Sequence, residues 1–236
     1  MAAILTSLQN TVIAGLVLAA ILFAIAIGSF GVGVDQAFWA FVFRWFHVLS
    51  GVMWIGLLWY FNFVQIPNMP NIPDEQKPAI GKVIAPAALF WFRWGAMATI
   101  ITGLILAHLN GYLVDALTLS LSGGGGGEMP AALEGASKMM ADAGAAMGSD
   151  MNIFDGLVEK NFVIGIGMWL GAIMWFNVWF IIWPNQQKAL NINNKYPNLD
   201  ADSKAASARR AMLFSRTNTL LSIPMLFCMV AAQNLF

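Results

Sequence analysis

The sequence predicts an all-α integral membrane protein with five transmembrane helices. Hydrophobic residues make up 59% of the 236 residues, charged residues only 10%, and the mean hydropathy is +0.69. Soluble domains carry about 25% charged residues. Five apolar stretches each reach the roughly 20 residues that a helix needs to cross a bilayer. A tryptophan- and glycine-containing motif occurs twice, so we expect a four-helix bundle of two parallel two-helix repeats plus one N-terminal helix.

The N-terminal segment, residues 1–37, contains the first predicted span at residues 5–30. No Lys or Arg precedes this span, so we interpret it as an uncleaved helix and not as a secretory signal. The first repeat covers residues 38–109 and holds the second span, 38–63, and the third, 86–109. Three prolines soon after residue 63 end the second span, because proline cannot continue a helical hydrogen-bond ladder.

Residues 110–160 form a polar, acidic insert between the repeats. Its five consecutive glycines, residues 123–127, predict a flexible segment. The second repeat, residues 161–236, holds the fourth span, 161–183, and the fifth, 211–236. Small residues at four-residue intervals in the third span predict close helix packing there; they are Gly95, Thr99 and Gly103.

The repeated motif lies in the second and fourth spans. In the first copy, WIG at 54–56 is followed after three residues by YFN at 60–62. In the second copy, WLG at 169–171 is followed after three residues by WFN at 175–177. Internal repeats indicate a duplicated architecture. We expect the mid-span tryptophans Trp54 and Trp169 to pack in the core.

The distribution of basic residues predicts the orientation of the chain. The linkers that follow the second and fourth spans hold Lys77, Lys82, Lys188, Lys195, Lys204, Arg209 and Arg210. The opposite side has only Lys138 and Lys160. Because basic residues concentrate on the cytoplasmic side, we expect a bacterial inner-membrane protein with a cytoplasmic N-terminus. Its C-terminus and acidic insert would then be periplasmic.

Composition excludes several classes of function. The formal net charge is zero, so nothing indicates a nucleic-acid partner, and the lipid bilayer is the expected surrounding. The single cysteine, Cys228, allows neither an intrachain disulfide nor a cysteine metal cluster. Two histidines are too few for an all-histidine metal site.

Those two histidines are nevertheless candidate cofactor ligands. His47 lies about nine residues into its span, roughly 13 Å from the outer boundary. His108 lies near the outer end of the antiparallel third span. Two histidines from neighbouring helices can hold a haem iron axially, so we predict a haem b bound by His47 and His108. The alternative is that His47 hydrogen-bonds a neighbouring helix and His108 lies among lipid headgroups.

Arg44 lies one helical turn outward from His47 on the same face. We predict that it pairs with a haem propionate or with an anionic substrate, the alternative being that it extends to the membrane surface.

A second polar layer is predicted nearer the cytoplasm. Asn62 and Asn177 end the two copies of the motif, and Arg93 and Arg216 occupy corresponding places in the two halves. An arginine fork suits planar anions, so these four residues predict a pseudo-symmetric anion-binding site. The alternative is a structural network in which each asparagine satisfies an arginine or a kinked backbone.

Four stretches resemble a known family: RWFHVLSGVMWIGLLWYFNF, FRWGAMATIITG, NVWFIIWPNQQK and SRTNTLLSIPMLF. They resemble the N-terminal membrane domain of bacterial membrane-bound urate oxidases, also called urate hydroxylases. Full-length members of that family carry a C-terminal periplasmic cytochrome c. This sequence has no CxxCH motif, so the resemblance implies a separate cytochrome c as electron acceptor.

A second, weaker similarity concerns HVLSGVMWIGLLWY. It is similar to the first helix of bacterial membrane-embedded protoporphyrinogen oxidases and related copper-resistance-type membrane proteins. In those proteins a histidine in this place is associated with haem b, which implies the same role for His47.

The sequence therefore favours a membrane-bound oxidoreductase of urate-oxidase membrane-domain type. It would pass electrons through haem b to a periplasmic cytochrome c. One alternative is a non-catalytic accessory subunit of a larger respiratory or photosynthetic membrane complex. The other is a small-molecule transporter, since parallel repeats with a polar layer also suit transport.

Overall fold

The computed structural model describes residues 2–31, 33–119 and 160–235. Its regular elements are all helical: α1 (Ala2–Leu5), α2 (Leu8–Phe30), α3 (Gln36–Trp59), η1 (Tyr60–Gln65), α4 (Ile66–Asn68), η2 (Met69–Asn71), α5 (Lys77–Ala79), η3 (Ile80–Ile84), α6 (Ala85–Leu109), α7 (Leu113–Leu117), α9 (Lys160–Phe176), η4 (Asn177–Ile182), α10 (Trp183–Leu190), η5 (Ile192–Asn194) and α11 (Ala201–Asn234). The predicted glycine run of the insert lies outside the described residues.

Five helical segments are long and apolar enough to cross a membrane, which confirms the predicted all-α membrane fold. They are Leu8–Ser29, Gln36–Asn71, Lys77–Leu109, Lys160–Leu190 and Ala201–Asn234. Short connections join the second segment to the third and the fourth to the fifth, and the insert lies between the third and the fourth.

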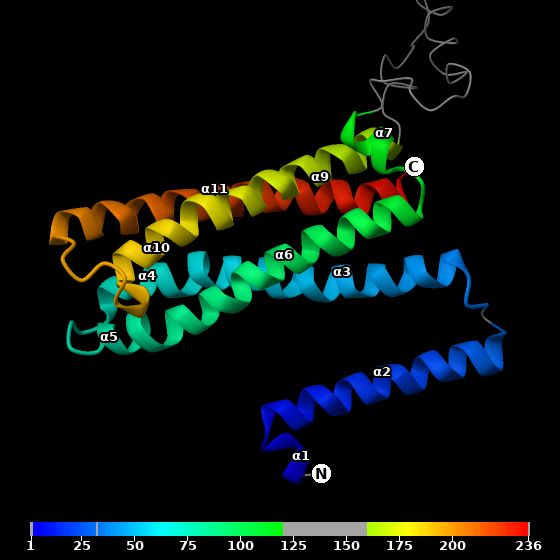
Figure 1. The fold of residues 1–236 in the computed structure, drawn as a ribbon, viewed down its shortest axis with the longest axis horizontal. Helices are drawn as coiled ribbons and strands as arrows, with labels where there is room; N and C mark the ends of the chain where they lie inside the picture. The colour runs from blue at the N-terminus through cyan, green and yellow to red at the C-terminus, as the bar shows by residue number, and fades with distance from the viewer. Residues whose placement is uncertain (1, 32, 120–159, 236) are drawn as a thin grey trace, which may run out of the picture.

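The last four segments form the bundle, in which α3 packs against α6 and α9 packs against α11 (Figure 1). Helices α3 and α9 run in one direction and α6 and α11 in the other, as expected for two parallel repeats. At one end of the bundle, the insert end, α6 ends and α9 begins. At the other, the linker end, lie α4, α5 and α10.

Helix α2 stands apart from the bundle, as the predicted N-terminal helix on its flank (Figure 1). Its contact with α3 is aromatic: the Phe23 ring lies edge-on to Phe38, Phe41 and Trp45, with ring centroids 5.6–6.1 Å apart. Most of its large apolar side chains are exposed, which suits a helix surrounded by lipid.

The predicted stripe of small residues on α6 is the surface that packs against α3. A Cβ atom added at Gly95 would lie 3.3 Å from the Trp54 backbone nitrogen. One added at Gly103 would lie 2.9 Å from Cε1 of His47. The absence of these side chains therefore lets the two helices approach closely. Below this contact, Trp54, Leu58 and Phe92 are almost completely buried in the core shared by both repeats.

Three π-helical segments interrupt the long helices, and each ends two residues before a proline. Segments η1, η3 and η4 precede Pro67, Pro86 and Pro184. A proline ring clashes with the carbonyl group four residues earlier and donates no hydrogen bond. The wider π turn relieves this clash without ending the helix, so Pro67, the first of the prolines predicted to end the second span, does not end it.

Helix α7 is anchored to α9 by two residues. Gly165 faces the α7 backbone so closely that an added Cβ would lie 2.3 Å from the Ala116 carbonyl oxygen. Trp169 donates its indole N–H to the Leu117 carbonyl at 3.0 Å. The predicted core position is correct for Trp54, which is 1% exposed, and wrong for Trp169, which is 47% exposed. Trp169 lies outside the core because its indole faces α7, where the Leu117 carbonyl accepts its N–H.

Replacing Gly165 with alanine should destabilise the protein by about 1–3 kcal/mol, because the added methyl group overlaps the α7 backbone. The matched control is Gly171→Ala in the same helix, where an added Cβ meets nothing within 4 Å. That change should be neutral or stabilising by up to about 1 kcal/mol. Unfolding of both variants in mixed micelles, followed by circular dichroism, tests this. Equal stability of the two variants would contradict the α7–α9 contact.

Candidate functional site

His47 is held by the backbone of α6. Its Nδ1 atom lies 2.9 Å from the Thr99 carbonyl oxygen, and the Thr102 hydroxyl lies 3.4 Å from the same nitrogen. A carbonyl oxygen only accepts hydrogen bonds, so Nδ1 of the neutral ring carries the proton and donates it. The other ring nitrogen, Nε2, therefore carries a lone pair that is able to bind a metal.

His108 is not brought to the same place. It is exposed and lies nine residues after Thr99 on α6. At about 100° per residue, nine residues turn its side chain roughly 180° away from the face that holds His47. The structure therefore places the two predicted haem ligands on different sides of α6.

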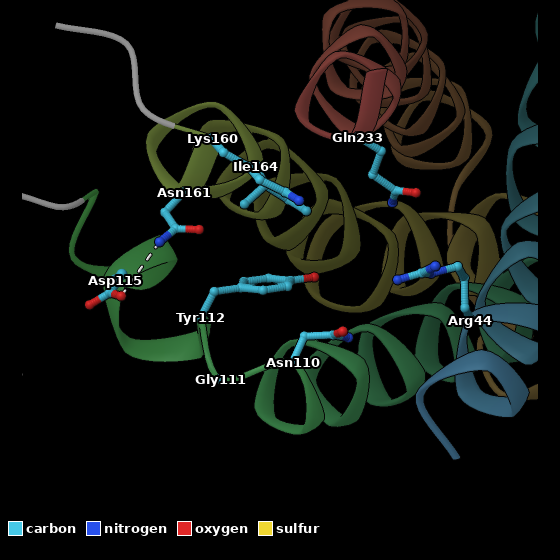
Figure 2. A pocket seen from close by; sticks show the side chains of 9 residues that line it. All are labelled: Arg44, Asn110, Gly111, Tyr112, Asp115, Lys160, Asn161, Ile164 and Gln233. Atoms are coloured by element: carbon cyan, nitrogen blue, oxygen red, sulfur yellow. Dashed lines mark hydrogen bonds between the residues drawn. The ribbon is translucent and has the colours of Figure 1, made fainter. Parts of the chain in front are cut away.

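A polar cavity of about 310 Å³ lies at the insert end of the bundle (Figure 2). The polar side chains that line it are Arg44, Asn110, Tyr112, Asp115, Lys160, Asn161 and Gln233. They come from α3, from the connection between α6 and α7, from α7 itself, and from α9 and α11. Arg44, predicted to pair with a haem propionate or an anionic substrate, thus faces a cavity lined by five parts of the chain.

The end of α6 places Tyr112 in this cavity. Gly111 has a φ angle of +76°, in the left-handed region that glycine adopts without strain. Its backbone N–H bonds the His108 carbonyl at 3.0 Å, and that of Tyr112 bonds the Ala107 carbonyl at 3.2 Å. This pair of bonds is a Schellman motif, which reverses the chain direction. As a result, the Tyr112 hydroxyl points toward Arg44 across the cavity (Figure 2).

The charged groups of the cavity are not paired with one another. Asp115 accepts a hydrogen bond from the Asn161 amide at 3.5 Å (Figure 2). Within the described part of the chain, only Lys77 and Asp74 form an ion pair, so Arg44 and Lys160 have no carboxylate within 4.0 Å there. Burial raises the pKa of the Tyr112 phenol, although the nearby Arg44 charge opposes the shift. The phenol therefore keeps its proton at neutral pH and donates hydrogen bonds.

The predicted second layer is built around α11. The Asn62 amide donates to the Ser215 hydroxyl at 2.8 Å, and the Asn177 amide donates to the Asn218 side-chain oxygen at 2.8 Å. Asn218 in turn donates to the Met174 carbonyl at 2.9 Å. Both motif asparagines therefore bond the same helix, so the layer does not follow the twofold symmetry of the sequence repeat.

The two arginines of this layer point elsewhere. The Arg93 guanidinium lies over the Trp183 ring, with Cζ 3.2 Å from the ring centroid, and its Nε donates to the Leu89 carbonyl at 3.1 Å. Arg216 is exposed on the outer side of α11. Neither these arginines nor Asn62 and Asn177 line the cavity at the insert end. The contacts of this layer are those of a structural network, while anion binding by it stays a prediction.

Comparison with known proteins addresses the resemblance directly. Residues 136–234 match the family model described as Urate oxidase N-terminal. This match confirms the resemblance to urate oxidases. It covers less than half of the chain and includes α9, α10 and α11, but neither Arg44 nor His47. No curated protein and no solved structure matches the chain, and the similarity to haem-binding membrane proteins stays a prediction.

Several site residues escaped the sequence prediction. In the stretch matched by the urate oxidase N-terminal model, Ser215, Asn218 and Ser222 form the buried polar face of α11. Ser222 accepts a hydrogen bond from the Trp59 indole at 3.0 Å. Their spacing of three and four residues is a detectable signal for one helix face. Tyr112 and Gln233 gave no such signal, because each lies alone beyond or near a span end.

Replacing Asn218 with leucine should destabilise the protein by about 1–3 kcal/mol, because the buried Asn177 amide loses its acceptor. The exposed neighbour Thr217 supplies the control, and Thr217→Leu should change stability by less than about 0.5 kcal/mol. Unfolding by a denaturing detergent provides the measurement. A loss of stability that is the same in both variants would show that the Asn177–Asn218 bond is not important for the bundle.

Proposed function

We propose that the chain is a membrane-bound oxidoreductase of urate oxidase type, in which His47 binds a haem b that passes electrons to a periplasmic cytochrome c. The match to the urate oxidase N-terminal family supports the reaction class. The hydrogen bond from His47 to Thr99 is the single observation that carries the assignment of His47.

The residues around His47 fit one axial haem ligand. Metal-binding histidines commonly donate their second N–H to a backbone carbonyl, which fixes the ring and makes the ligating nitrogen more basic. Thr99 plays this part, and Gly103 leaves room for the ring beside it. His108 does not fit as the second ligand from the same helix pair, because it points to the other side of α6. A haem bound to His47 would supply one-electron chemistry.

The environment of Arg44 is not that of an arginine with a purely structural role. It lies one turn from His47 and lines the cavity at the insert end. Of the two roles predicted for it, contact with an anionic substrate is favoured by this position. The proposed orientation, with the C-terminus periplasmic, places the cavity and His47 toward the side on which a soluble cytochrome c would dock.

Purified protein should show a Soret absorption band, and His47→Ala should remove most of it, because the iron loses its ligand. The control is His108→Ala, which should keep the band, since His108 lies away from His47. Absorption spectra of oxidised and reduced protein, with haem content measured per chain, test the proposal. A wild-type protein without bound haem, or equal haem loss in both variants, would rule out haem binding by His47.

Gly103→Ala provides a second test that leaves His47 in place. The added methyl group would lie 2.9 Å from the imidazole Cε1 and push the ring from its position. We expect a shifted Soret band or at least a twofold lower haem content. Gly56→Ala in α3, where an added Cβ meets nothing within 4 Å, should leave the spectrum unchanged. An unchanged spectrum in both variants would contradict a haem ligated by His47.

A further inference from the structure

We propose that the surface around Arg93, toward the linker end, binds the phosphodiester group of an anionic phospholipid whose acyl chains lie along the apolar side chains of α6. Arg93 does not line the cavity at the insert end. Lipid binding at Arg93 is also independent of the proposed oxidoreductase function, because neither His47 nor Arg44 takes part in it.

The protein holds the Arg93 guanidinium in one orientation. Its Cζ atom lies 3.2 Å from the centroid of the Trp183 ring and 5.8 Å from that of Trp179. Its Nε atom donates to the Leu89 carbonyl at 3.1 Å. A guanidinium stacked on an indole keeps the edge of its planar fork free for hydrogen bonds. These contacts therefore orient the fork without using its terminal N–H groups.

The terminal nitrogens of Arg93 have no partner among the described residues. Neither Nη1 nor Nη2 donates a hydrogen bond to that part of the chain, and Arg93 forms no ion pair with it. The side chain is half-buried, but these nitrogens are not enclosed by the protein, so a ligand can reach them from outside. A charged group at membrane depth is costly without a counter-ion, and an anion from the surroundings is therefore expected there.

The contact with Trp183 places the fork at the boundary of the bilayer on the linker side. Helix α9 and segment η4 end at Ile182 and together span roughly 33 Å, close to the thickness of a hydrocarbon core. Trp183 follows directly, and the sequence after it, PNQQK, is polar. Tryptophans concentrate at the level of the lipid headgroups. The fork therefore lies within reach of a lipid phosphate, in the leaflet that the predicted orientation makes cytoplasmic.

The apolar surface beside Arg93 favours a lipid over a soluble anion. Phe90 and Trp94, on the same helix, are 48% and 50% exposed. The Trp94 ring stands edge-on to Trp179, with ring centroids 5.6 Å apart, so the two helices present a continuous aromatic surface. Acyl chains cover such a surface, whereas a soluble phosphate ion would leave it bare.

The charge of the linker end favours an anionic headgroup. Its connections, residues 66–84 and 184–210, hold seven basic residues against four acidic ones, and the structure describes all of them. Lys82 and Lys188 lie in segments that touch, since a Cβ atom added at Gly81 would lie 3.5 Å from Cδ2 of Leu190. Basic surfaces between transmembrane helices on the cytoplasmic side are typical sites for anionic lipid headgroups.

Native mass spectrometry of the full chain, released from detergent micelles, tests the site by counting the lipids that each chain retains. The probes are dioleoyl phosphatidylglycerol, dioleoyl phosphatidylcholine, which has the same chains but no net charge, and inorganic phosphate. We expect the first phosphatidylglycerol to bind about fivefold more tightly than phosphatidylcholine. An excess of inorganic phosphate should not displace it, because the ion lacks acyl chains.

Arg93→Gln should weaken binding of the first phosphatidylglycerol about fivefold, through loss of the charged fork. Trp183→Leu keeps the charge but removes the stacking, and we expect about threefold weaker binding. The matched control is Arg209→Gln, which removes one positive charge from the same end of the bundle and should change the affinity less than about twofold. Circular dichroism confirms that each variant is folded.

Three results would overturn the proposal. Equal affinity of the wild type for both lipids would show that the headgroup charge is not recognised. Equal weakening by Arg93→Gln and Arg209→Gln would show only a general attraction between basic residues and anionic lipid. Displacement of the lipid by inorganic phosphate would show that the surface binds a free anion. None of these results bears on the haem content, so the oxidoreductase proposal is tested separately.

Discussion

The close contact between α3 and α6 is the constraint on which the rest of the structure depends. In a bilayer, helices gain little from burying apolar surface against each other, so close packing and hydrogen bonds must hold them together. Gly95 and Gly103 remove the side chains that would separate these two helices. The approach brings the Thr99 carbonyl to 2.9 Å from His47, so the same contact that stabilises the bundle also fixes the imidazole. Movement of α6 would loosen the ring, the end of α6 and the Schellman motif that positions Tyr112.

Helix α11 has the complementary role of satisfying polar side chains from both repeats. Ser215, Asn218 and Ser222 lie on one buried face and bond Asn62, Asn177 and Trp59 respectively. Side chains of this kind are costly in an apolar interior unless each finds a partner. Because α11 supplies all three partners, it joins the two repeats and breaks the symmetry that their shared motif suggests. His47 has no counterpart in the second repeat, where Phe162 stands at the corresponding position.

The sequence predicted the fold better than the site, and particular residues show why. Span number, the motif repeat and the packing stripe of α6 depend on local composition and spacing, which the sequence contains directly. Trp169 was predicted wrongly to lie in the core, and the role of His108 as a haem ligand found no support. The contacts of both residues depend on how each helix is rotated. A shift of one residue turns a side chain by about 100°. Rotation is set by packing against distant helices, and neither hydropathy nor spacing records it.

The cavity could not be predicted from the sequence either. Its lining residues are spread along the chain from Arg44 to Gln233 and share no motif. What they share is a position toward the insert end of the bundle (Figure 2). Helix ends in a membrane protein are where polar side chains cost least, and a site assembled there can be rich in charge without destabilising the spans. His47 lies deeper, one turn below Arg44, against the Thr99 carbonyl oxygen and the Thr102 hydroxyl of α6. Polar side chains therefore gather in the cavity at the insert end, while the His47 imidazole is held deeper between α3 and α6.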